Sequence, residues 1–146
     1  MPAFNKFQAT VLHLASGVHQ LQTGSAHVLK VYLTNTAPNA ATHAVRADLT
    51  EISAGSGYTA GGNSCTLTTG AQTGGTFKLT LADPPTWTAT GGSIGPFRYA
   101  VLYNDTPTSP ADPMLGWWDY GSALTLASGE TFTVDLDQTG GTLTLA

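Results

Sequence analysis

Charged residues are scarce in this chain of 146 residues. Asp, Glu, Lys and Arg make up 10% of the sequence, against about 25% in a typical soluble domain. With 5 Lys and Arg against 9 Asp and Glu, the formal net charge is −4, so the basic footprint of a nucleic-acid-binding protein is missing. Coiled coils and helical bundles need abundant Glu, Lys and Arg and are excluded too. A disordered chain is also excluded, because 41% of the residues are apolar and the net charge is low.

Cysteine is nearly absent, and long apolar runs are missing. The single cysteine, Cys65, has no partner for an internal disulfide or a CxxC zinc site, and we expect a reducing cytosol as the site of maturation. No apolar run approaches the roughly 18–20 residues that cross a bilayer, so no membrane partner is expected. Residues 1–7 carry one positive charge and no long apolar stretch, which is unlike a secretory signal. We therefore expect synthesis in the host cytoplasm.

Catalytic and metal-binding patterns are incomplete. Gly91–Gly95 fits the G-x-S-x-G nucleophile elbow around Ser93, but that motif needs a following helix and a later histidine. Here Pro96 and a strong strand pattern follow. All four histidines come earlier in the chain: His13, His19, His27 and His43. Their spacings match no metal motif, and nothing selects two of the nine acids as a glycosidase pair. We expect no enzymatic activity, no catalytic residue, no metal and no cofactor.

The strand pattern indicates one all-β domain, in keeping with a length typical of a single domain. From Ala26 onward, short runs rich in β-branched and aromatic residues alternate with turn-forming clusters. The expected strands are His27–Thr34, Cys65–Thr69, Thr76–Leu81, Trp87–Ala89, Phe97–Tyr103, Met114–Tyr120, Leu124–Leu126, Thr131–Leu136 and Thr142–Leu145. Residues 26–146 are therefore predicted to form an antiparallel β-sandwich or barrel, jelly-roll-like in architecture, within a single domain 1–146.

Two segments allow finer predictions about burial. In Thr76–Leu81, apolar and polar residues alternate strictly, which predicts a half-buried strand. Phe97–Tyr103 is partly apolar on both faces and is predicted to be a central strand. One of its faces is expected to hold Phe97, Tyr99, Val101 and Tyr103. The stretch Ala40–Ile52 stays ambiguous, because its helical spacing is weakened by threonines.

The N-terminal segment 1–25 carries the helical pattern of this chain. Its apolar residues recur at spacings of three and four, which predicts one face of a short helix. These residues are Phe4, Phe7, Val11, Leu14 and Val18. Gly17 marks a helix end. Two interpretations stay open: the face packs on the sheet of its own domain, or the segment is an arm that docks on a neighbouring subunit.

Aromatic side chains are the remaining candidates for an interaction surface. Trp117 and Trp118 are adjacent, so they must point to opposite faces if their segment is a strand. Exposed Trp and Tyr can stack on sugar rings or anchor a subunit interface, and core packing is the alternative for each of them. With the apolar helix positions, the candidate interface residues are Phe4, Phe7, Val11, Leu14, Trp87, Trp117, Trp118 and Tyr120.

Five ordered segments carry a resemblance that covers the chain from about Phe4 to Ala146. They are Val31–Asn39, Gly57–Gly62, Gly92–Asp105, Gly116–Gly121 and Leu126–Phe132. These segments resemble a family of small proteins encoded in tailed-bacteriophage genomes. The resemblance implies a virion component, and a capsid decoration (cement) protein is the expected role. The family offers no catalytic residues to carry over.

That role implies particular partners. A cement protein is expected on the capsid exterior, bound to the major capsid protein at the junctions between capsomers, without contact to nucleic acid. Symmetric positions recruit symmetric binders, so self-association into a homotrimer is expected. The alternatives are a carbohydrate-binding head-fibre or tail-fibre module that recognises host glycans, and a head–tail joining or tail-tube protein.

Overall fold

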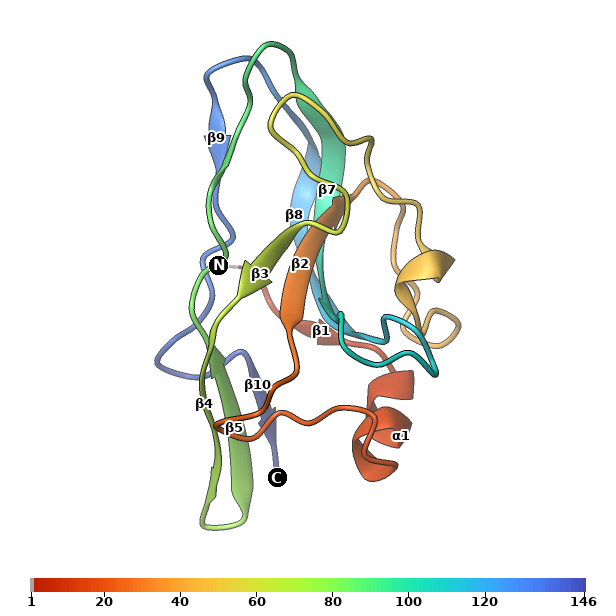
Figure 1. Ribbon diagram of the computed structural model, residues 1–146, viewed down its shortest axis with the longest axis vertical. Helices are drawn as coiled ribbons and strands as arrows, with labels where there is room; N and C mark the ends of the chain where they lie inside the picture. Colours follow the sequence, from red (N-terminus) through yellow and green to blue (C-terminus); the bar gives the residue numbers. More distant parts are fainter. Residues whose placement is uncertain (1) are drawn as a thin grey trace.

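The computed structural model describes residues 2–146, and strands dominate it (Figure 1). One α-helix, α1 (Ala9–Ala15), and one 3-10 helix, η1 (Arg46–Asp48), lie in this part of the chain. The strands are β1 (Asn5–Lys6), β2 (Leu29–Thr34), β3 (Asn63–Cys65), β4 (Leu67–Thr73), β5 (Thr76–Leu81), β6 (Trp87–Thr88), β7 (Ile94–Asn104), β8 (Met114–Leu126), β9 (Thr131–Phe132) and β10 (Leu143–Leu145).

The main sheet is antiparallel and has the strand order β1-β8-β7-β2-β3. Its centre is β7, which pairs with β2 from Tyr99 to Asn104 on one side and with β8 on the other. The predicted central strand is thus confirmed. Its β-branched and aromatic residues suit a strand that is covered on both faces.

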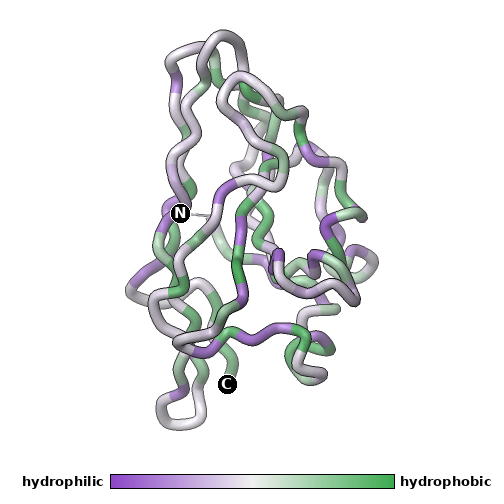
Figure 2. Tube along the Cα trace, viewed as in Figure 1, coloured by the Kyte–Doolittle hydropathy of each residue, from purple (hydrophilic) through white to green (hydrophobic). Residues whose placement is uncertain are grey.

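A second layer covers one face of the main sheet. It consists of the sheet β10-β5-β4 and the ribbon β6-β9. The principal core lies between the layers, where Leu33 and Leu102 of the main sheet join Leu79 and Trp87 of the covering layer. Two antiparallel layers around one core form the β-sandwich that the strand pattern predicts. In Figure 2, apolar residues recur along the inner strands, and the loop tips are white or purple.

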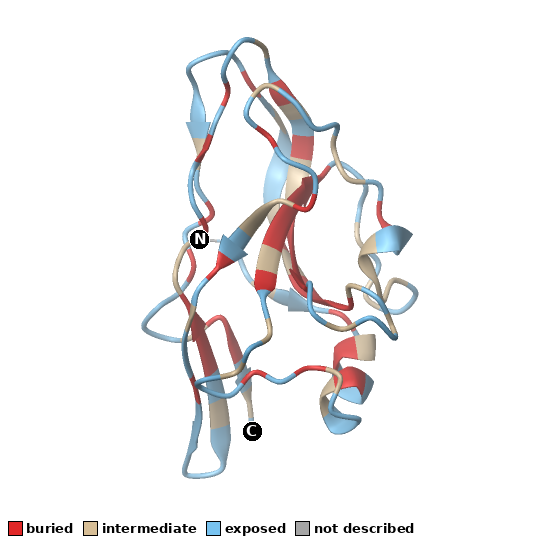
Figure 3. Ribbon diagram, in the orientation of Figure 1, coloured by how far each residue is buried: buried red, intermediate tan, exposed pale blue. Residues whose placement is uncertain are grey.

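The other face of the main sheet carries a smaller core. Tyr32, Val101, Tyr103 and Met114 meet there, together with Phe7. The N-terminal segment and the long connection from β2 to β3 cover this face. Figure 3 shows how burial continues along β2, whose alternating residues enter the two cores in turn.

The N-terminal segment differs from the predicted helix, although a short helix does form. Helix α1 has 7 residues and begins only after β1 has paired with β8 at Gly116 and Trp117. Phe4, Phe7 and Val18 therefore lie outside it, and Val11, which is inside, is 54% exposed. The buried side of α1 carries Thr10 and His13 instead. The spacing of apolar side chains predicts a helix from Phe4 onward, but the backbone hydrogen bonds of β1 to β8 keep residues 5–6 extended.

The ring contacts of this segment show how it packs within its own chain. Phe4 packs on Trp118 with 5.0 Å between ring centroids, and Phe7 packs on Trp117 at 4.7 Å. Both tryptophans belong to β8 of the same chain. The N-terminal segment therefore packs on the sheet of its own domain, and Trp117 and Trp118 point to opposite faces, as predicted.

Several predicted strands have different bounds. Met114–Tyr120 and Leu124–Leu126 are parts of one long strand, β8, whereas only Thr131–Phe132 of the predicted Thr131–Leu136 is a strand. Phe97 lies with Ala100 and Leu102 in the principal core, and not on the face of Val101 and Tyr103. Irregular pairing on both sides of Phe97 shifts the alternation there.

Candidate binding surfaces

An aromatic cleft opens between β7, β8 and the segment that follows β9. Its volume is about 190 Å³. The buried residues Phe97, Ala100, Trp118 and Val134 form its floor. The less buried lining residues are Pro2, Arg98, Tyr99, Tyr120, Phe132, Thr133 and Asp135. An apolar floor with a few polar groups around it is the usual composition of a small-molecule site. The cleft is therefore one of two candidate binding surfaces.

Strand irregularities shape this aromatic cleft. Phe97 pairs with Leu124, but Tyr99 pairs with Asp119, so the four residues 120–123 of β8 stand opposite one residue of β7. The backbone nitrogen of Gly121, at a φ of 101°, donates to Oδ1 of Asp119 at 2.8 Å. The bulge leaves Tyr120 52% exposed, with its ring 5.9 Å from Phe132 in an edge-on arrangement.

An ion pair lies beside the cleft. Nε of Arg98 donates to one oxygen of Asp119 at 2.7 Å and Nη2 to the other at 2.9 Å, a bidentate pair. The guanidinium lies 5.3 Å from the ring centre of Tyr99. Its hydrogen bonds hold the pKa of Asp119 below its usual value. Asp135, from the segment after β9, supplies the carboxylate that lines the cleft itself.

Helix α1 presents the second candidate surface. Val11 and Leu12 are adjacent and are 54% and 67% exposed. The hydroxyl of Thr10 fixes the opposite side of the helix by donating to the carbonyls of Met114 and Leu115 in β8, at 3.2 and 2.9 Å. We call the exposed pair Val11–Leu12 the helix patch.

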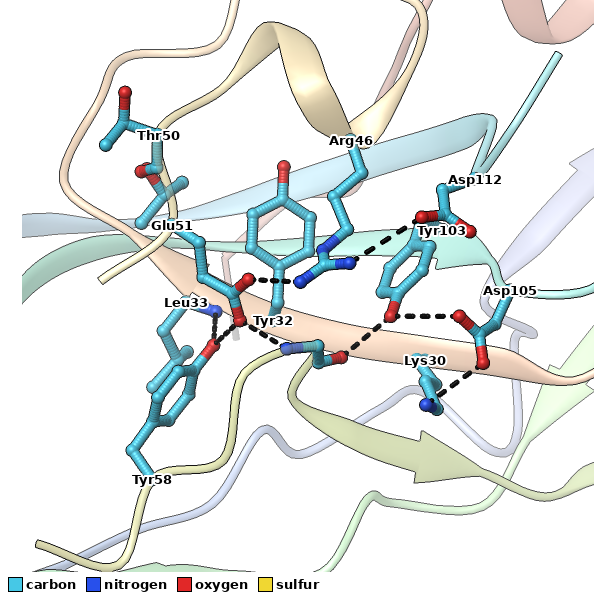
Figure 4. A network of polar contacts seen from close by, with 12 residues as sticks. Lys30, Tyr32, Leu33, Arg46, Thr50, Glu51, Tyr58, Tyr103, Asp105 and Asp112 are labelled. Carbon is cyan, nitrogen blue, oxygen red and sulfur yellow. Dashed lines mark hydrogen bonds and ion pairs between the residues drawn. The ribbon is translucent and has the colours of Figure 1, made fainter. Parts of the chain in front are cut away.

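A polar network fixes the β2–β3 connection over the smaller core (Figure 4). Glu51, whose side chain is 14% exposed, accepts hydrogen bonds from Arg46, from the hydroxyl of Tyr58 at 2.6 Å and from the backbone nitrogen of Gly61 at 2.7 Å. The hydroxyl of Tyr58 in turn accepts from the backbone nitrogen of Leu33 in β2 at 3.0 Å. One carboxylate thus ties the connection together, and Tyr58 ties it to β2.

The network continues along β7. The hydroxyl of Tyr103 donates to the carbonyl of Gly61 at 2.9 Å, and Arg46 lies 5.4 Å from the Tyr103 ring centre. Lys30 pairs with Asp105 at 3.0 Å. Burial raises the pKa of Tyr103 and of Tyr58, so both hydroxyls keep their protons and act as donors. Because these charged groups pair with one another, the network holds the connection against β2 and β7.

Three histidines gather around Asn104, which is fully buried at the end of β7. His19 and His27 contact its side-chain amide, and His13 of α1 lies 5.6 Å from His19 between ring centroids. Burial, followed by the proximity of His13 and then His27, lowers the pKa of His19 to about 4. Burial also lowers the pKa of His13.

The candidate interface residues fall into three groups. Phe7, Trp87 and Trp118 are 0%, 1% and 5% exposed and fill the cores, and Trp118 also lines the aromatic cleft. Half-buried positions are Phe4, Leu14 and Trp117, which pack on those cores. The exposed members are Val11 and Tyr120, one in the helix patch and one at the cleft.

Sequence reasoning missed three contributors to these surfaces. Leu12 falls outside the predicted helix face, and Arg98 and Phe132 were assigned only to strands. The exposure of Leu12 follows from which side of α1 meets β8, which spacing alone does not give. The run Leu126–Phe132 shows no sign that its Phe132 reaches across to Tyr120 of the bulge.

No match to this chain is found among models of known protein families, among curated proteins or among solved structures. Within residues 2–146, no group of three or more His, Cys, Asp or Glu side chains is placed to hold a metal ion. No helix in the same range is long and apolar enough to span a membrane. Ser93 is followed directly by β7, not by the helix of a nucleophile elbow.

Proposed function

We propose that this protein is a structural component of a tailed-bacteriophage virion that binds the outer surface of the major capsid protein shell and stabilises it. The resemblance of five ordered segments to small phage proteins supports the proposal. The proposed activity needs buried contact area and shape, and no reactive group. The β-sandwich has two cores, and hydrogen bonds fix its β2–β3 connection. Such a rigid domain suits a protein that must keep its shape while the capsid resists the pressure of packaged DNA.

The helix patch is the observation that carries the proposal. The exposure of Val11 and Leu12 is unfavourable in free energy, because apolar side chains are more stable when they are removed from water. The hydroxyl of Thr10 holds the helix against β8, so the patch is presented on a fixed support and little ordering is needed on binding. An apolar patch on an anchored element fits a protein partner such as a shell subunit.

The scarcity of charge agrees with assembly in many copies. With 10% charged residues and a net charge of −4, neighbouring copies repel one another weakly. The negative sign disfavours a position against packaged DNA and favours the outer surface. A symmetric shell offers repeated junctions between capsomers, and we propose that the protein binds there as a trimer.

The test is binding to expanded capsids stripped of accessory proteins, measured by co-sedimentation. We expect the wild-type protein to bind and Leu12→Asp to lose about tenfold in affinity or more. The matched control is Val28→Asp, which places the same charge at an exposed apolar residue outside α1. Failure of the wild-type protein to bind, or equal binding by Leu12→Asp, would overturn the proposal.

A further inference from the structure

We infer that the aromatic cleft binds a neutral sugar ring. This site is independent of the proposed shell contact. Helix α1 is fixed to β8 at Met114 and Leu115, whereas the cleft begins at Trp118 and continues to Tyr120. One end of β8 would thus serve attachment, and the middle of the strand would serve ligand binding.

The size of the cleft limits the ligand. At about 190 Å³ the cleft is smaller than the roughly 300–1,000 Å³ of sites that enclose drug-sized molecules. The cleft can hold a single ring. It can also hold the terminal ring of a longer ligand, whose remaining part extends through the open side of the cleft into solvent. A polymer whose units are single rings, as in a polysaccharide, meets this condition.

Aromatic rings provide the surface that one face of a sugar needs. A pyranose ring presents C–H groups on a face, and these favour the electron-rich face of an aromatic ring. Trp118 lies in the floor of the cleft, and Tyr120 and Phe132 meet edge-on at its wall. A sugar ring placed here exchanges water for apolar contact over its C–H face.

Polar groups around the cleft suit the hydroxyl groups of the sugar. Arg98 offers only donors and Asp135 only acceptors, and both line the cleft. Arg98 is already paired with Asp119, so its charge is compensated and the carboxylate of Asp135 remains. An acidic sugar would meet that carboxylate with a like charge, whereas a neutral sugar can donate a hydroxyl hydrogen to it. The charges therefore favour a neutral ligand.

The bulge in β8 gives the cleft its form. A regular strand would pair residues 120–123 with β7, and instead they stand opposite a single residue. β-Bulges are common beside binding sites, where they redirect a side chain. Here the redirected side chain is Tyr120, which is 52% exposed and lines the cleft.

The experiment is saturation-transfer NMR with a panel of neutral monosaccharides, namely glucose, galactose, rhamnose and N-acetylglucosamine, and with sialic acid as the acidic member. We expect transfer to at least one neutral sugar, with little to sialic acid. Trp118 supplies a second readout, because a bound ring changes the surroundings of its indole and hence its fluorescence. Tyr120→Ala should weaken binding about tenfold or more.

Matched variants separate this inference from the shell contact. Leu12→Ala removes an exposed side chain from the helix patch and should leave sugar binding unchanged, and Tyr120→Ala should leave capsid binding unchanged. Because Tyr120 is 52% exposed, its removal should leave the melting temperature close to that of the wild-type protein. No transfer to any sugar of the panel, binding that survives Tyr120→Ala, or preference for sialic acid would overturn the inference.

Discussion

The side-chain nitrogen of Asn104 lies 3.2 Å from Nδ1 of His19 and donates a hydrogen bond to it. The second hydrogen of the same amide is directed at Nδ1 of His27, at 2.8 Å. The orientation of the amide is set by Thr106, whose backbone nitrogen donates to the amide oxygen of Asn104 at 3.3 Å. Nδ1 of His19 must therefore accept, which only a neutral imidazole can do when its hydrogen is on Nε2.

Acid should destabilise the protein through His19. Its pKa is lowered to about 4 in the folded protein, so between about pH 6.5 and 4 the unfolded chain binds more protons than the folded one. Above about pH 6.5, neutral His19 makes its full contribution to the free energy of unfolding. This contribution decreases as the pH is lowered from about 6.5 to 4. The shift corresponds to about 3 kcal/mol at most. Urea unfolding at about pH 7 and about pH 4.5 measures it.

The control for this prediction is His19→Gln. The glutamine oxygen can accept the same hydrogen bond from Asn104 but cannot take up a proton in this range. The variant should show a clearly smaller change in unfolding free energy between the two pH values. Equal stability of the wild-type protein at both, or an unchanged difference in His19→Gln, would contradict the role given to His19.

Removal of the Glu51 carboxylate should destabilise the protein strongly. Glu51→Ala leaves Arg46, Tyr58 and the backbone nitrogen of Gly61 without their acceptor, and leaving such partly buried donors unpaired should cost about 2–3 kcal/mol. Asp119→Asn, which weakens the more exposed pair with Arg98, should cost less than about 1 kcal/mol. Chemical denaturation compares the two, and similar losses would contradict a special role for Glu51.

A side chain at Gly116 should disturb the N-terminal segment. A Cβ there would lie 2.4 Å from the carbonyl oxygen of Asn5 and 2.4 Å from the ring of Phe4. Gly116→Ala should therefore cost about 1–3 kcal/mol through overpacking. Gly74→Asn is the control, since nothing lies within 4 Å of its Cβ position and Asn tolerates a positive φ. Thermal melting compares the two variants: the melting temperature should fall for Gly116→Ala and stay close to the wild-type value for Gly74→Asn. A melting temperature unchanged by Gly116→Ala would refute the close approach of Asn5 and Phe4 to Gly116.

The thiol of Cys65 should be inert in the folded protein. It is buried, and burial, with a smaller effect of Asp83, raises its pKa to about 12. At about pH 8 the nucleophilic thiolate is therefore scarce and shielded. A thiol reagent should react slowly with the native protein and fully after denaturation. Rapid reaction of native protein would show that this part of the core opens readily.

Sequence reasoning recovered the fold class and most strand centres because they depend on local pattern. The alternation in Thr76–Leu81 predicts a strand with one buried face, and β5 has those same bounds, with Leu79 and Leu81 buried but Thr80 buried too. Phe97–Tyr103 is apolar on both faces, which predicts a strand with packing on both faces. β7 is accordingly the central strand of its sheet. These features need no knowledge of distant residues.

Long-range contacts explain what sequence reasoning missed. The helical spacing of Phe4, Phe7 and Val11 predicted a single face, but the pairing of Asn5 and Lys6 with β8 divides that run. The aromatic cleft joins β7, β8 and the segment after β9, and its shape depends on four residues that bulge from β8. Neither the pairing partner nor the bulge leaves a local signal, so the exposure of Leu12 and Tyr120 was not predictable from spacing.

We propose attachment to a phage capsid, and the decisive measurement is a reconstruction of a virion that contains this protein. We expect density for this β-sandwich on the outer surface at junctions between capsomers, in threefold groups, with α1 facing the shell. Its presence in a sixfold or twelvefold ring would instead indicate a tail or head–tail role. Either that ring, or absence of the protein from the shell surface, would show that the protein is not a capsid decoration protein.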